Sequence, residues 1–116
     1  MARVLLIETD QELEVLLGGV LQTAGHTVRP VRPDGDVARA LQTTPPHVVL
    51  IGPSLADVAG EALCQEVRRA SGKPIARLVA SGEPGSGCAD AYVAVPSHPR
   101  ALLSRVGALV RNGGTA

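Results

Sequence analysis

Few residues in this chain have the types and positions that chemistry requires. Glu8, Thr9 and Asp10 form a polar cluster directly after the apolar run 3–7, and a second apolar run, 47–51, ends at Gly52. In an open parallel sheet, reacting groups and ligands gather just beyond the carboxyl ends of the central strands. Because glycine has no side chain, the centre of the predicted sheet is chemically blank.

Other candidate groups do not combine into a site. Ser54 and Asp57 lie in the loop beyond Gly52, where a turn serine and a solvated carboxylate are the ordinary interpretations. The three histidines are spread over the chain without the spacing of zinc ligands: His26, His47 and His98. Cys64 and Cys88 form no C-x-x-C motif, so we expect free thiols, although a redox switch between them stays open.

The elements that must position these residues alternate along the chain. Short apolar runs predict strands at 3–7, 26–30, 47–51, 74–80 and 91–95, and apolar periodicity predicts helices between them. The first helix has a clear stripe, and Thr9 with Glu12 matches a capping box at its start. That stripe consists of Leu13, Leu16, Leu17, Val20, Leu21 and Ala24. Further helices are expected at 36–42, at 60–70 and from Pro99 to a stop near Gly113.

Strict alternation of this kind predicts an α/β fold with a parallel sheet, right-handed crossovers and helices on both faces. One connection lacks its helix, because the segment 81–87 holds three glycines and a proline. The 116 residues suit one domain, which we place at 1–112, with 113–116 as a tail or the start of a linker.

Composition excludes several classes of function. Eleven basic and eleven acidic residues cancel, so no overall charge favours nucleic-acid binding by the chain itself. No segment is apolar for long enough to span a membrane, and the amino terminus turns acidic too soon for a signal peptide. We therefore expect a cytoplasmic protein without a metal or cofactor.

Four segments together resemble the receiver domains of bacterial two-component response regulators. They are 4–10 (VLLIETD), 46–52 (PHVVLIG), 89–96 (ADAYVAVP) and the last helix, and the similarity covers essentially the whole chain. The resemblance implies a flavodoxin-like (CheY-like) five-stranded sheet in the order 2-1-3-4-5, here with the fourth helix absent or vestigial. It also implies an acidic pair, an acceptor Asp, a hydroxyl residue and a lysine at one site.

The chain departs from the family at each of these positions. Gly52 replaces the acceptor Asp, and Glu8-Thr9 replaces the acidic pair, with Asp10 expected to serve the helix start instead. Val79 replaces the hydroxyl residue and Val95 the lysine, while Pro96 is retained. Without nucleophile, cation ligand and counter-charge, the resemblance implies a degenerate receiver, or pseudo-receiver, that is not an enzyme.

The hypothesis is therefore a phosphorylation-independent module that binds a protein partner of a signalling pathway, as a monomer or weak dimer. Tyr92 occupies the position of the family's switch aromatic, next to the missing helix. The residues expected to contact a partner are Tyr92, Ser81, Glu83, Arg100 and Arg105. The alternative is a sensor that binds a small molecule or nucleotide in the vestigial pocket.

Overall fold

The computed structural model describes residues 2–33, 36–55, 57–80, 87–95 and 99–114. Five parallel strands form one sheet in the order β2-β1-β3-β4-β5, which confirms the predicted flavodoxin-like topology. The strands are β1 (Arg3–Ile7), β2 (Thr27–Val31), β3 (Val48–Ile51), β4 (Ile75–Ala80) and β5 (Ala91–Val95). The helices are α1 (Gln11–Thr23), α2 (Asp36–Thr43), α3 (Asp57–Ala70) and α4 (Pro99–Gly114).

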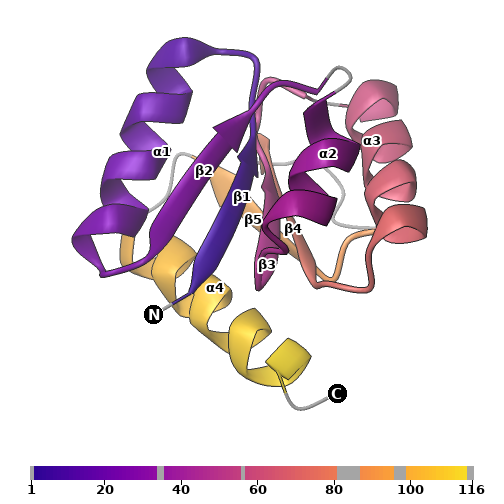
Figure 1. Cartoon of the computed structure of the whole chain (residues 1–116). Coiled ribbons are helices and arrows are strands. Elements are labelled where there is room, and N and C mark those ends of the chain that lie inside the picture. The colour runs from indigo at the N-terminus through magenta and orange to yellow at the C-terminus, as the bar shows by residue number, and fades with distance from the viewer. Residues whose placement is uncertain (1, 34–35, 56, 81–86, 96–98, 115–116) are drawn as a thin grey trace.

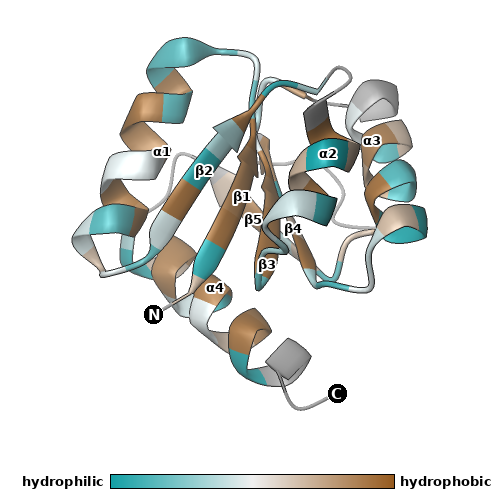
Figure 2. Ribbon diagram, viewed as in Figure 1, coloured by the Kyte–Doolittle hydropathy of each residue, from teal (hydrophilic) through white to brown (hydrophobic). Residues whose placement is uncertain are grey.

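Helices cover both faces of the sheet (Figure 1). The apolar sides of α1 and α4 pack on one face, and those of α2 and α3 pack on the other. All four residues of the central strand β3 are fully buried, because a parallel strand covered on both faces has no solvent side. The brown interior strands and the teal outer helix faces in Figure 2 show the same separation. No helix among the described residues is long and apolar enough to cross a bilayer.

The start and the inner face of α1 differ from the prediction. Asp10, not Thr9, caps the helix, because its carboxylate accepts the backbone N–H groups of Glu12 and Leu13 at 2.9 and 3.2 Å. The predicted capping box was therefore wrong. Leu16 was also wrongly assigned to the buried stripe: it is 63% exposed. Leu17, one residue and about 100° further round the helix, points to the sheet instead.

Several element boundaries differ from those predicted by one to three residues. β2 continues through Pro30 to Val31, which is tolerated because β2 is an edge strand and needs no donor on its free side. α3 begins at Asp57, three residues before the predicted start at Gly60. The last helix continues through Gly114, past the predicted stop at Gly113.

The described part of the chain between β4 and β5 contains no helix. Residues 81–86, which include Ser81 and Glu83, lie outside it, and residues 87–90 lead directly into β5. We call residues 87–90 the pre-β5 segment. Asp90 joins it to β4 by two short hydrogen bonds, one from the N–H of Ile75 to Oδ2 of Asp90 and one from the N–H of Asp90 to the Ile75 carbonyl, both 2.8 Å.

Candidate functional site

The candidate site lies at the carboxyl edge of the two central strands. Ile7 and Ile51 are register partners in β1 and β3, so the residues that follow them, Glu8 and Gly52, lie side by side. The N–H of Gly52 donates to the carbonyl of Ile7 at 2.8 Å, which continues the pairing past the strand ends. Glu8 and Gly52 thus lie next to each other at the carboxyl edge of the sheet, where the sequence predicted them.

Glu8 is almost completely buried, at 1% exposure. Its Oε1 accepts the backbone N–H groups of Thr9 and Asp10 at 3.1 and 3.3 Å, so half of the carboxylate is used by the turn that leads into α1. Its Oε2 is buried and has no hydrogen-bond partner in the described structure. A buried carboxylate oxygen without a donor is costly, so this orientation must be imposed by the surrounding packing.

The space beside Gly52 is filled by that same carboxylate. A Cβ placed on Gly52 would overlap Oε2 of Glu8 and would lie 2.6 Å from its Cδ. Real Cβ atoms do not approach other atoms so closely. Position 52 therefore carries no side chain, and the Glu8 carboxylate occupies the place where one would begin.

The residues around Glu8 do not fit the Mg²⁺ that receiver domains bind. Mg²⁺ prefers octahedral oxygen ligands with one or two carboxylates. Here Asp10 caps α1, and the hydroxyl of Thr9 is 2.8 Å from that of Ser54, on the exposed side. Within the described ranges, no three His, Cys, Asp or Glu side chains lie close enough to hold a metal. The orphaned Oε2 of Glu8 faces Gly52, where a second carboxylate would be needed.

The structure describes the two valines of the candidate site only in part. Val79 is buried in β4 and pairs with Ala94, whereas Val95 pairs with Ala80. The side chain of Val95 and all of Pro96 lie outside the described residues. The register thus sets Val79 and Val95 one residue apart along their strands.

A buried arginine is the feature that sequence reasoning missed. Arg77, in the middle of β4, has a side chain only 7% exposed, and its Nη1 lies 3.4 Å from Oε1 of Glu61 in α3. Its Nη2 donates to the carbonyl of Leu55 at 3.4 Å, and its Cζ lies 5.9 Å from the centre of the Tyr92 ring. A charged residue inside the apolar run 75–80 was the available signal.

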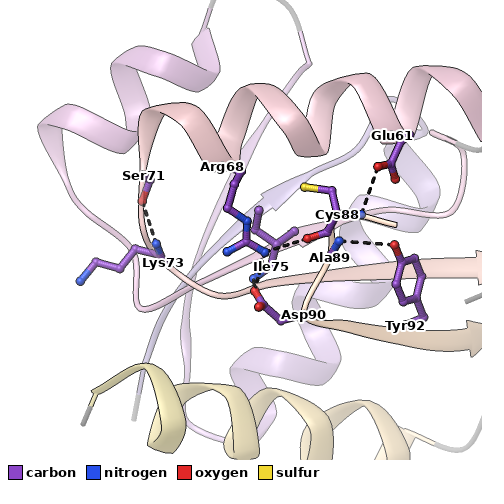
Figure 3. A network of polar contacts seen from close by, with 9 residues as sticks. All are labelled: Glu61, Arg68, Ser71, Lys73, Ile75, Cys88, Ala89, Asp90 and Tyr92. Atoms are coloured by element: carbon purple, nitrogen blue, oxygen red, sulfur yellow. Dashed lines mark hydrogen bonds and ion pairs between the residues drawn. The ribbon is translucent and has the colours of Figure 1, made fainter. Parts of the chain in front are cut away.

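Tyr92 is half-buried beneath the pre-β5 segment (Figure 3). Its hydroxyl accepts the N–H of Ala89 at 3.3 Å. Gly87 has a φ of 131°, and a Cβ there would lie 2.9 Å from the Tyr92 hydroxyl and 2.6 Å from Oε1 of Glu61. The hydroxyl of Tyr92, a residue predicted to contact a partner, therefore has a bond within the chain.

The remaining predicted contact residues are on α4, where Arg100 and Arg105 are exposed. Two exposed apolar side chains were not predicted: Val15 and Leu16 on α1, at 68% and 63% exposure.

Beside them, at the β2 edge, a groove of about 500 Å³ is lined by Glu14, Arg29, Pro30, Val31, Arg32 and Arg39. Three arginines from β2, its following turn and α2 thus surround one concave surface.

Comparisons with known proteins agree with this architecture. No protein-family model matches the chain. The chain is 34% identical over 117 residues to the transcriptional regulatory protein GltR of Pseudomonas aeruginosa, a match that covers 93% of the chain and 48% of GltR. It is 30% identical over 115 residues to the transcriptional regulatory protein BaeR of Escherichia coli, covering 94% and 48%. The chain spans about half the length of these curated relatives.

Solved structures share the whole fold. A CheY-like response regulator receiver domain from Methanospirillum hungatei has a TM-score of 0.83 at 18% identity, with 99% of this chain and 98% of that one covered. The BeF3-activated receiver domain of Klebsiella pneumoniae RstA has a TM-score of 0.78 at 23% identity, with 94% and 98% covered. Sequence similarity across nearly the full chain and a shared strand order thus lead to one conclusion: this chain has the CheY-like fold of response-regulator receiver domains and is similar in sequence to bacterial transcriptional regulatory proteins.

Proposed function

We propose that this receiver domain signals without phosphorylation, by binding a protein partner in a two-component-type pathway. One observation carries the proposal: Gly52 has no side chain, and the carboxylate of Glu8 fills the space that an acceptor side chain would need. Phosphoryl transfer requires a nucleophile that can reach the phosphorus in line. The site has none, so the domain acts through its surface.

The other positions of the site support the same interpretation. A hydroxyl and a lysine would neutralise charge on a phosphoryl group, and Val79 and Val95 offer neither. Asp10 and Oε1 of Glu8 are used by the first turn of α1, so the polar cluster serves the fold. These features favour a constitutive binding module that is not an enzyme.

We propose a binding surface with two parts. The first is the predicted one around β5 and α4, with Tyr92, Arg100 and Arg105, and with Ser81 and Glu83, which lie outside the described residues. The second is the apolar pair Val15 and Leu16 on α1, because adjacent exposed apolar side chains are the usual anchors of an interface.

The test of phosphorylation independence is a labelling experiment. The chain is incubated with Mg²⁺ and acetyl phosphate beside a receiver that has an acceptor Asp, and intact masses are recorded. We expect no mass gain in this chain under conditions that label the control receiver. A stable gain of one phosphoryl group would overturn the proposal, and peptide mapping would then start at Ser54 and Asp57.

The partner is tested separately, by capture with the chain and with a Leu16→Glu variant. Leu16 is exposed, so this substitution should leave the unfolding midpoint almost unchanged. We expect a protein retained by the wild type and lost with Leu16→Glu. Retention by both variants would remove α1 from the proposed surface.

A second candidate function is the recognition of a small anion. The vestigial pocket is unsuited to it, because Glu8 fills the space beside Gly52. The groove at the β2 edge suits it better: Arg32 and Arg39 line it, and neither forms an ion pair with a described side chain. Titration with ADP should then raise the melting temperature of the wild type and of Arg69→Ala, but not of Arg32→Ala. No shift in the wild type would eliminate this candidate.

A further inference from the structure

Two cysteines that are 24 positions apart in sequence (64 and 88) join the same apolar cluster on the α3 side of the sheet. Cys64, in α3, is fully buried, and Cys88, in the pre-β5 segment, is half-buried. Cys64 belongs to the core cluster under α2 and α3, and Cys88 packs against that same cluster. Both are free thiols in this structure.

The backbone of Cys88 is attached to α3 at two points (Figure 3). Its N–H donates to Oε2 of Glu61 at 3.1 Å, and its carbonyl accepts from Nη2 of Arg68 at 2.8 Å. Glu61 and Arg68 are seven residues apart and share one face of the helix. Cys64 lies between them, three residues after Glu61, so the two attachments hold Cys88 over the turn that carries Cys64.

The position of the pre-β5 segment is fixed further by Asp90. Its Oδ2 is 2.9 Å from Nη2 of Arg68 and also accepts the N–H of Ile75 in β4 at 2.8 Å. Figure 3 shows the sulfur of Cys88 directed toward α3. Burial and, next, the neighbouring Cys88 thiol raise the pKa of Cys64 to about 12.

We propose that Cys64 and Cys88 are an oxidisable dithiol that closes to a disulfide between α3 and the pre-β5 segment. A low-molecular-weight disulfide such as oxidised glutathione is the oxidant. The thiolate of Cys88, the more accessible sulfur, attacks one glutathione sulfur and releases one glutathione. The thiolate of Cys64 then attacks Sγ of Cys88 and releases the second. The two cysteine protons leave on the two glutathione thiols, so one disulfide is reduced as another forms.

The bond would stabilise the connection between β4 and β5. It would close a loop that contains β4 and the undescribed residues 81–86, and it would fix the segment whose Ala89 N–H binds the Tyr92 hydroxyl. Cross-linking such a loop restricts the unfolded chain, which should raise the melting temperature by roughly 5–15 °C.

The test uses the full chain in buffers of reduced and oxidised glutathione, followed by alkylation of free thiols and intact mass measurement. We expect the wild type to lose both alkylation sites and two hydrogens, without glutathione attached and without dimer formation. Cys64→Ala should stop at a mixed disulfide between Cys88 and glutathione. Cys88→Ser should stay reduced, because Cys64 is buried.

The fold's own contribution is measured by repeating the equilibration in concentrated urea. If α3 holds the thiols together, the equilibrium constant for disulfide closure should be at least about tenfold larger in the native chain than in the urea-unfolded chain. Closure and folding are linked, so the disulfide should stabilise the folded chain by the same factor. Accumulation of the mixed disulfide at Cys88 in the wild type would overturn the proposal. So would an equilibrium constant no larger in the native chain than in urea.

Discussion

The substitution Gly52→Ala tests whether the carboxylate of Glu8 occupies the acceptor position. The added methyl group would overlap Oε2 of Glu8 and lie 2.6 Å from its Cδ and 3.2 Å from its Cβ. Glu8 is buried and its Oε1 is bonded to two backbone N–H groups, so the side chain cannot move aside without losing those bonds. We expect the variant to be destabilised.

The magnitude follows from two opposing contributions. Overpacking a buried site by one methyl group costs about 1–3 kcal/mol. Gly52 has no positive φ, so alanine adds no backbone strain, and restriction of the unfolded chain returns about 0.4–1 kcal/mol. In a Glu8→Ala background the overlap is gone, and the same substitution should become neutral or stabilising. The predicted coupling between positions 8 and 52 is therefore about 1–3 kcal/mol.

The assay is a double-mutant cycle on the free energy of unfolding, measured in urea. Gly19→Ala is the matched control, since a Cβ at Gly19 would have no neighbour within 4 Å. This control should stabilise α1 by about 0.5–1 kcal/mol in both backgrounds. Equal effects of Gly52→Ala with and without Glu8 would refute the assignment of this space to the Glu8 carboxylate.

Three further predictions concern single sites. Asp10→Ala should lower the free energy of unfolding by about 1 kcal/mol through loss of the α1 cap, and Asp10→Asn by much less. Glu61 is 35% exposed and 3.4 Å from Nη1 of the buried Arg77, so Glu61→Ala should cost about 1–2 kcal/mol, still more than Arg77→Met. The reverse order would contradict the assignment of Arg77 as a buried charge that needs this carboxylate. Burial and then the charge of Arg3 lower the pKa of His47 from its ordinary value of 6.5, so the unfolded chain takes up the proton first as the pH falls. The free energy of unfolding should therefore be constant above pH 6.5 and decrease below it. The free energy of unfolding is measured in urea one pH unit above and one below 6.5. Between these two pH values it should fall less for His47→Asn, whose Oδ1 can still accept the Arg3 N–H, than for the wild type. An equal fall in both would refute this role of His47.

The sequence predicted the architecture because the relevant signals are local. Apolar runs bounded by glycine and proline mark the strands, and the spacing of apolar residues marks the helices. Alternation of the two then implies a parallel sheet with its active edge at the carboxyl ends. The proposal that Gly52 takes the acceptor position likewise needs no coordinates, since it depends on residue type at an aligned position.

Details of the helix start and faces were harder to predict. The sequence offered two candidates for the start of α1, a Thr9–Glu12 capping box and Asp10, and backbone geometry selects Asp10. Leu16 fits the apolar stripe by spacing, but the part of α1 that contacts the sheet is too narrow to include it, so its side chain stays exposed. Local patterns predict that a helix is amphipathic, while the packing partner decides where its buried face ends.

Contacts between distant residues were decided by the tertiary structure alone. The sequence shows Glu8 and Gly52 as separate positions, and only the β1–β3 register brings the carboxylate into the space beside the glycine. Cys64 and Cys88 carry no motif, and they meet because α3 and the pre-β5 segment pack on the same face of the sheet. Composition and periodicity specify elements one at a time, whereas these sites arise from the strand register and the packing of helices onto the sheet.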